Sequence, residues 1–93
     1  MKITFDPVKR DRTLRERGLD FADADHVFAG VTLDWPDERH DYGELRIIMV
    51  GYLHERMVIV CWTPRSGTRH VFSMRKANER EKAKYGVALQ KDR

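Results

Sequence analysis

Two apolar segments, residues 45–53 and 57–63, constrain the fold most, because only residues 54–56 separate them. In both segments apolar side chains occupy successive positions instead of alternate ones, which is typical of strands buried on both faces. A connection this short fits a β-hairpin. We therefore expect the two segments to be antiparallel neighbours and central strands of a sheet.

Two helices are predicted before this hairpin. Asp6 and Pro7 are typical of a helix start, and Gly18 is typical of a helix end. Asp20 can cap a second helix, which Gly30 would end. Apolar residues recur at helical spacing within that second segment, namely Phe21, Ala24, Val27 and Phe28.

Further elements complete a mixed helical and β pattern. Strands are predicted at residues 1–5, 31–35 and 68–74, and a charged C-terminal helix at residues 76–85. The inner stripe of that last helix holds only Ala77, Ala83 and Tyr85, so we expect it to be weakly docked. The order β-α-α-β-β-β-β-α predicts an α+β fold. In it, a small antiparallel sheet carries two N-terminal helices on one face and a C-terminal helix.

The composition is that of a globular protein. With 93 residues, 41% of them hydrophobic and 35% charged, the chain has the size and balance of one domain, residues 1–93. No apolar run reaches the roughly 18 residues of a membrane helix, and the N-terminus shows no signal stretch. A cytoplasmic location is therefore expected, and the single Cys61 allows no disulfide within the chain.

Charge is distributed unevenly along the chain, although the net charge is only +3. Lys and Arg outnumber Asp and Glu in residues 1–19 and again in residues 45–93, whereas acids predominate in residues 20–44. The two basic segments can combine into a cationic surface of the kind that binds phosphates. Ordinary solvated helices would explain the same pattern, so charge alone does not decide between the two.

Motifs for metal or cofactor chemistry are absent from the sequence. The four histidines are scattered and form neither an H-x-H nor an H-E-x-x-H pattern. The acids on either side of Pro36 lack the spacing of a calcium loop, and the glycines form no phosphate-binding loop. Cys61 lies within an apolar strand and is expected in the core, not as a nucleophile. We therefore expect no metal and no cofactor.

The last predicted strand carries the side chains best suited to binding phosphate. Alternation would place Arg69, Val71, Ser73 and Arg75 on one face, and His70, Phe72 and Met74 on the core face. Alternate residues are about 7 Å apart, close to the spacing of successive phosphates in a nucleic acid. Arg46 could join from an adjacent strand, and arginine binds phosphate through two parallel, charge-assisted hydrogen bonds. An exposed sheet face with ion pairs is the alternative.

Four stretches of the chain together resemble the BrnT family of ribonuclease toxins. The first is Phe5-Asp6-Pro7 with Lys9, and the second is Arg17-Gly18-Leu19-Asp20-Phe21 with Ala24, Val27 and Phe28. The third is Gly43-Glu44-x-Arg46, and the fourth is Ser73-Met74-Arg75-x-Ala77 with Glu81 and Tyr85. The resemblance covers nearly the whole chain. It departs at Thr13 and Arg17, where the family often has Asn and His, so an acid or base role of that histidine does not transfer.

The resemblance implies a fold like that of the RelE toxins and a ribonuclease activity that arrests translation and growth. It also implies a BrnA-like antitoxin with a ribbon-helix-helix DNA-binding domain, in an assembly of two toxins and two antitoxins. RNA, on or off the ribosome, would be the substrate; DNA would be reached only through the antitoxin, and no membrane is involved. The basic residues of the C-terminal stretch are expected to contact RNA or the antitoxin, namely Lys76, Arg80, Lys82 and Lys84.

For the chemistry we expect metal-independent cleavage, in which a ribose 2′-hydroxyl attacks the neighbouring phosphate. The residues expected to hold the phosphate and stabilise its developing charge are Lys9, Arg46, Arg69 and Arg75. The candidate proton carriers are Glu44, Tyr85 and His54. The alternative is a toxin-derived module that binds nucleic acid or a ribbon-helix-helix partner without cleavage, since phosphate binding needs no base.

Overall fold

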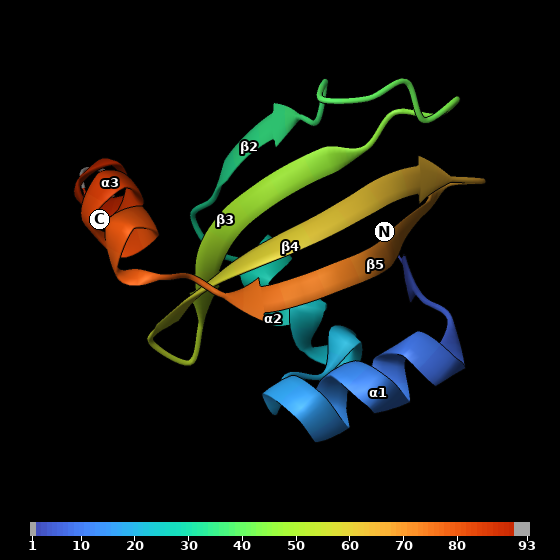
Figure 1. The fold of residues 1–93 in the computed structure, drawn as a ribbon, viewed down its shortest axis with the longest axis horizontal. Coiled ribbons are helices and arrows are strands. Elements are labelled where there is room, and N and C mark those ends of the chain that lie inside the picture. The colour runs from blue at the N-terminus through green and yellow to red at the C-terminus, as the bar shows by residue number, and fades with distance from the viewer. Residues whose placement is uncertain (1, 91–93) are drawn as a thin grey trace.

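A five-stranded sheet forms the centre of the computed structural model, which describes residues 2–90 (Figure 1). The strands are β1 (Lys2–Thr4), β2 (Leu33–Pro36), β3 (Ile47–Leu53), β4 (Arg56–Arg65) and β5 (Thr68–Lys76), in the order β1-β5-β4-β3-β2. The predicted hairpin is confirmed, because β3 and β4 pair as antiparallel neighbours inside the sheet. His54 and Glu55 form its turn with φ angles of 49° and 70°, a conformation that fits the twist of a two-residue hairpin.

The sheet is mixed, which corrects the prediction of an antiparallel one. β1 pairs parallel with β5, with Lys2 opposite Thr68 and Thr4 opposite His70, whereas the other strand pairs are antiparallel. Short connections determine the direction of the later strands. They do not constrain β1, which is remote from β5 in sequence and adds to its free edge. Met1, the expected first residue of this strand, lies outside the described residues.

The N-terminal helical region begins as the sequence predicts and then divides. In α1 (Pro7–Arg17), the Asp6 side chain accepts a backbone hydrogen bond in the first turn, and Gly18 ends the helix with a φ of 70°. The second predicted helix is a 3₁₀ turn, η1 (Phe21–Asp23), followed by the short helix α2 (Ala24–Phe28). No helix within the described part of the chain is long and apolar enough to cross a membrane.

Asp20 joins these first helical elements. Its side chain caps η1 through the N–H of Ala22 and accepts two hydrogen bonds from Arg10 of α1, at 2.9 and 2.6 Å. The Arg10 guanidinium holds the pKa of the Asp20 carboxyl below its ordinary value, although partial burial opposes this. The ion pair therefore fixes α1 against the start of η1.

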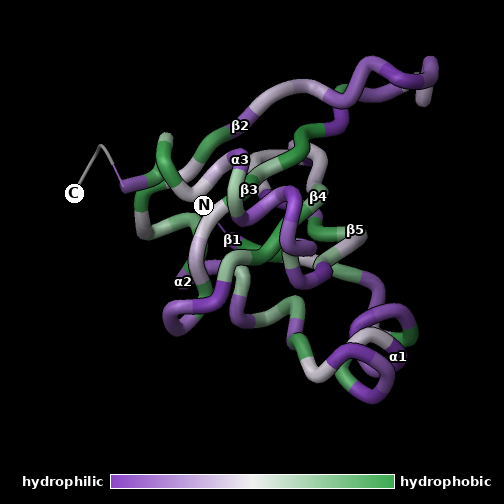
Figure 2. The backbone as a smooth tube through the Cα atoms, turned by 60° about the vertical axis from the view of Figure 1, so that its left-hand side comes forward, coloured by the Kyte–Doolittle hydropathy of each residue, from purple (hydrophilic) through white to green (hydrophobic). Residues whose placement is uncertain are grey.

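Helices pack on both faces of the sheet. α1 and α2 lie on one face, and α3 (Glu79–Gln90) lies at the opposite end of the molecule from the start of α1 (Figure 1). The helix-side core contains Leu19, Phe21, Ala24, Val27, Met49, Leu53, Val58, Val60, Val71 and Met74. The α3-side core contains Val50, Met57, Ile59, Ala77 and Leu89. Figure 2 shows the hydrophobic central strands and the hydrophilic loop between β2 and β3.

The C-terminal helix is longer than its sequence suggests. It extends to Gln90, beyond the predicted end at residue 85. Leu89 is only 1% exposed and packs in the α3-side core, where the ring of Tyr85 also contacts it. Leu89 escaped the prediction because it lies past the predicted end of the helix, so the apolar stripe of α3 had seemed weaker than it is.

Candidate functional site

A β-bulge in β5 determines which way the side chains of this strand point. Cys61 of β4 pairs with Ser73, and the next residue, Trp62, pairs with Val71. Phe72 therefore has no partner in β4. An inserted residue of this kind locally breaks the alternation of side chains along a strand.

The bulge overturns the predicted grouping of the β5 side chains. Val71 and Met74, which alternation places on opposite faces, are both fully buried in the helix-side core. Arg69 lies on that same side of the sheet, over the ring of Phe28. Ser73 and Arg75 instead pair with residues of the α3-side core and its margin, so they lie on the other face.

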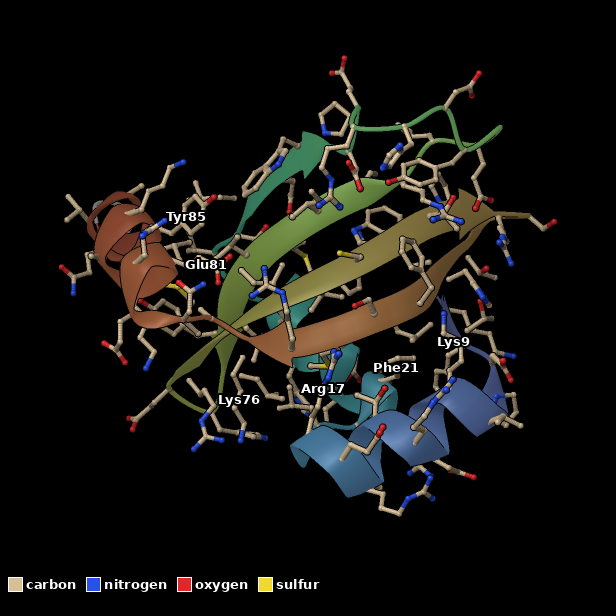
Figure 3. All side chains as sticks on the ribbon, viewed as in Figure 1. Lys9, Arg17, Phe21, Lys76, Glu81 and Tyr85 are labelled. Atoms are coloured by element: carbon tan, nitrogen blue, oxygen red, sulfur yellow. The ribbon has the colours of Figure 1, made fainter. Side chains whose placement is uncertain are left out.

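Two adjoining pockets along α1 and β5 form a surface that we call the cationic groove. The first, of about 420 Å³, is lined by Asp6, Lys9, Arg46, Arg65, His70, Val71 and Phe72. The second, of about 410 Å³, is lined by Lys9, Arg12, Thr13, Glu16, Arg17, Phe72 and Ser73. They share Lys9 and Phe72. Lys9 and Arg17 extend from α1 on the side that faces β5 (Figure 3). The lining thus has five cationic side chains, Lys9, Arg12, Arg17, Arg46 and Arg65, against two carboxylates, Asp6 and Glu16.

The bulged residue Phe72 gives the groove an aromatic surface. The guanidinium carbon of Arg46 lies 4.7 Å from the centre of the Phe72 ring, and Lys9 Nζ lies 5.8 Å from it. Arg46 is also 4.1 Å from the centre of the Tyr42 ring. These cation–π contacts restrict the guanidinium to few orientations. A restricted cation loses less conformational entropy when it binds an anion.

Glu44 lies between two of the arginines. Its carboxylate accepts a hydrogen bond from Arg46 Nε at 3.2 Å and one from Arg65 Nη2 at 3.3 Å. Burial acts to raise the pKa of Glu44, but the two arginines outweigh it and hold the pKa below its ordinary value. Glu44 is therefore ionised at neutral pH and serves to orient Arg46 and Arg65. A carboxylate of low pKa is a weak proton acceptor.

His70 lines the groove, although alternation had placed it in the core. Its Nδ1 lies 3.0 Å from Thr4 Oγ1, across the parallel pairing of β1 with β5. Partial burial lowers the pKa of the imidazole, and the nearby charge of Arg65 lowers it further. Sequence reasoning missed both His70 and Arg65. Arg65 lies between the predicted segments 57–63 and 68–74, beyond the predicted end of the first. Nothing in the sequence signals that β1 would bring Thr4 beside His70.

Arg17 has a structural contact as well as a place in the groove. Its Nη1 donates to the carbonyl oxygen of Met74 at 2.9 Å. Because β1 pairs only with residues 68–70 of β5, this carbonyl lies on an edge that β1 does not cover. Arg17, at the position where the resembling family often has histidine, therefore caps the exposed edge of β5.

Besides His54 in the hairpin turn, three of the predicted phosphate or proton-transfer residues lie outside the groove. Arg69 stacks 4.1 Å from the centre of the Phe28 ring on the helix side of the sheet. Arg75 forms two 2.8 Å hydrogen bonds with Glu81. Tyr85 packs in α3 with its ring centre 5.5 Å from that of Trp35. Glu81 and Tyr85 are both on the α3 side of the molecule in Figure 3. Of the predicted set, the structure brings together Lys9, Arg46 and Glu44.

The other sequence candidates lie in ordinary structural surroundings. His54 is exposed in the hairpin turn, with its ring centre 5.6 Å from that of His26. Burial raises the pKa of the Cys61 thiol, which disfavours the reactive thiolate. Asp37, from the acidic stretch, binds Arg39 in two hydrogen bonds. Among residues 2–90, no three His, Cys, Asp or Glu side chains gather in a group that could hold a metal ion.

Comparison with known proteins gives the family. The family model for BrnT, the ribonuclease toxin of type II toxin–antitoxin systems, matches residues 5–81. This match begins just after β1 and includes the helical region, all the later strands and the first turn of α3. No curated protein matches the chain in sequence. The chain belongs to the BrnT family of ribonuclease toxins of type II toxin–antitoxin systems.

Proposed function

We propose that the cationic groove binds the RNA backbone and that the protein cleaves RNA there without a metal ion. The observation that carries this proposal is the convergence of Lys9, Arg46 and Arg65 around the bulged Phe72. Cations of this kind attract phosphates, and an aromatic ring offers a surface on which a base can stack. The groove therefore suits a single RNA strand, which presents both groups.

Arg46 is the central phosphate-binding residue in this proposal. Its Nε is bound by Glu44, and its plane lies against Tyr42 and Phe72. Its two terminal nitrogens donate no hydrogen bond within the described part of the chain. They are free to make the two parallel bonds by which a guanidinium holds a phosphate. The same bonds would stabilise the negative charge that develops in phosphodiester cleavage.

Arg75 and Tyr85 have a supporting role in the proposal, and Arg69 has a structural one. Arg75 is engaged by Glu81 and would reach a phosphate only by giving up that ion pair. Tyr85 and Glu81 belong to α3, so these contacts stabilise the helix against the sheet. Arg69 faces Phe28 and Trp62. Any effect of the loss of Arg75 on cleavage would therefore arise through the placement of α3.

The partner we propose is a BrnA-like antitoxin with a ribbon-helix-helix domain. Membership in a type II family implies an antitoxin, and occlusion of the cationic groove would silence cleavage directly. We propose an assembly of two toxins and two antitoxins in the cytoplasm, in which DNA is contacted by the antitoxin. Cleavage of RNA would then arrest translation whenever the antitoxin is removed.

The test compares the wild type with Arg46→Ala and with the control Arg56→Ala, an exposed arginine at the start of β4 that does not line the groove. RNA cleavage is measured with purified protein after exhaustive chelation. Wild type and Arg56→Ala should cleave equally, whereas Arg46→Ala should lose at least about 10-fold in rate, the effect of one lost transition-state contact. Activity that disappears on chelation and returns with added metal would contradict the metal-independent scheme.

A second candidate function is a module that binds RNA without cutting it. The replacement of a family histidine by Arg17, which caps the Met74 carbonyl, favours this alternative. Growth distinguishes the two functions, because an active ribonuclease arrests growth when it is expressed without its antitoxin. Normal growth with intact RNA, at confirmed expression of folded protein, would favour the binding module.

A further inference from the structure

A chain of three hydrogen bonds leads from His70 to the backbone of β4. Thr68 Oγ1 donates to the carbonyl oxygen of Arg65 at 2.7 Å. Thr4 Oγ1 lies 3.3 Å from Thr68 Oγ1, and His70 Nδ1 lies 3.0 Å from Thr4 Oγ1. The parallel pairing of β1 with β5 aligns the three side chains, since Lys2 is opposite Thr68 and Thr4 is opposite His70.

The direction of this chain determines which nitrogen of His70 carries the proton. A carbonyl oxygen only accepts, so the single hydroxyl proton of Thr68 points to Arg65. In the arrangement that satisfies all three contacts, Thr68 Oγ1 then accepts from the hydroxyl of Thr4. Thr4 Oγ1, having used its own proton, accepts from His70 Nδ1–H. This arrangement protonates the neutral imidazole at Nδ1 and leaves the lone pair on Nε2.

The side chain of His70 lines the cationic groove. His70 lines the pocket together with Lys9, Arg46 and Phe72, and its Nε2 makes no hydrogen bond within residues 2–90. The charged groups around the ring are Arg65 of β4, Lys9 and Asp6 at the start of α1, and Glu44 before β3. Partial burial and the two cations lower the pKa of His70, which keeps the ring neutral at pH 7.

We propose that His70 is the general base of the cleavage reaction and that Thr4 and Thr68 are positioning residues that fix its tautomer. The inference rests on the proposed function of the cationic groove. Nε2 takes the proton of the ribose 2′-hydroxyl as the 2′ oxygen bonds to phosphorus. The bond from phosphorus to the 5′ oxygen breaks, and that oxygen takes a proton from water. The products are a 2′,3′-cyclic phosphate and a 5′-hydroxyl, and the imidazolium returns its proton to solvent.

The test uses His70→Gln, with His26→Gln as a matched control because His26 is an exposed residue of α2. Cleavage of a short RNA oligonucleotide is followed against pH, and binding is measured with its 2′-O-methyl counterpart, which cannot be cleaved by this route. His70→Gln should lower kcat at least about 100-fold and change the Kd for the 2′-O-methyl oligonucleotide less than about 3-fold. The wild-type rate should rise with pH through the lowered pKa of His70, below 6.5. This rise, the acidic limb of the pH–rate profile, should be absent in His70→Gln.

Thr4 supplies a second test that leaves the imidazole in place. Thr4→Val removes the acceptor of Nδ1–H and should lower kcat about 10-fold with little change in Kd. Thr4→Ser keeps the hydroxyl and should restore the rate, which a purely structural role of the side chain does not predict. If His70→Gln fails to fold, the comparison of Thr4→Val with Thr4→Ser tests the role of His70 in its place.

The failures of the two proposals are distinguishable. A wild type that binds RNA and never cleaves it refutes the ribonuclease function and, with it, the role of His70. A wild type that cleaves, together with a folded His70→Gln that keeps its rate and its acidic limb, refutes the base assignment alone. Equal rates in Thr4→Val and Thr4→Ser would refute the positioning role of Thr4.

Discussion

The ion pair between Arg75 and Glu81 joins the end of β5 to the first turn of α3. Arg75 Nη1 and Nη2 each donate to a Glu81 carboxylate oxygen at 2.8 Å. Glu81 also accepts from the N–H of Asn78, while its own N–H donates to the Asn78 side chain. This reciprocal arrangement is a capping box. Glu81→Gln retains an oxygen for the cap and removes the charge, so it isolates the ion pair.

The expected size of the effect follows from bonding and exposure. Two charge-assisted hydrogen bonds would be worth several kcal/mol if buried, but the side chains are 43% and 20% exposed and solvent screens them. We expect a coupling energy of about 1–2 kcal/mol from a double-mutant cycle with Arg75→Ala and Glu81→Gln. In a domain of this size each kcal/mol lowers Tm by roughly 4–8 °C.

The coupling should also depend on pH. The hydrogen bonds from Arg75 lower the pKa of Glu81 to about 2, from an ordinary value of 4.5. A carboxyl whose pKa is lower in the folded state stabilises the fold fully above its unfolded pKa and progressively less as the pH falls. The stabilisation should therefore be complete at pH 7, and about half of it should be lost by pH 3.

The assay is urea unfolding of the four proteins of the cycle at pH 7 and at pH 3. A coupling energy below about 0.3 kcal/mol at pH 7, or one equal at both pH values, would refute the reasoning. The same proteins separate the structural role of Arg75 from a catalytic one. If Arg75 acts through α3, Glu81→Gln will lower RNA cleavage as much as Arg75→Ala does.

Two further substitutions test the packing on each face of the sheet. Gly51→Ala would place a Cβ 2.7 Å from Val27 Cγ1 and 3.1 Å from Thr32 Cγ2. This overpacking should lower the free energy of unfolding, measured in urea, by about 1–3 kcal/mol. An unchanged free energy of unfolding would refute the close approach of α2 to β3. Leu89→Ala should cost about 2–4 kcal/mol, because the side chain is 1% exposed in the α3-side core. A loss below about 1 kcal/mol, measured in the same way, would show that α3 does not depend on this residue.

Local signals in the sequence predicted much of the fold. Asp6 and Gly18 correctly marked the two ends of α1, because helix capping depends on residues within one turn. The β3–β4 hairpin followed from two apolar segments and a short connection. These features are local, so a single sequence carries them. Lys9, Arg46 and Glu44 were identified as site residues, and the structure brings these three together around the groove.

What escaped prediction depends on long-range pairing. The parallel addition of β1 to β5 places Thr4 beside His70, and no local pattern predicts it. The bulge at Phe72 reverses the faces assigned to part of β5, which separated Arg69 from Arg75 and brought His70 out of the presumed core. A one-residue insertion in a strand shifts every side chain beyond it to the other face.

The most direct test of the central claim is an NMR titration of the wild type with the 2′-O-methyl oligonucleotide. The location of the backbone amide shifts reports where the RNA strand binds. If RNA binds in the cationic groove, the largest shifts will occur at Lys9, Arg46 and Phe72, with α3 little affected beyond its first turn. Shifts concentrated on the exposed face of α3, around Arg80 and Lys84, with the groove residues unchanged, would contradict it.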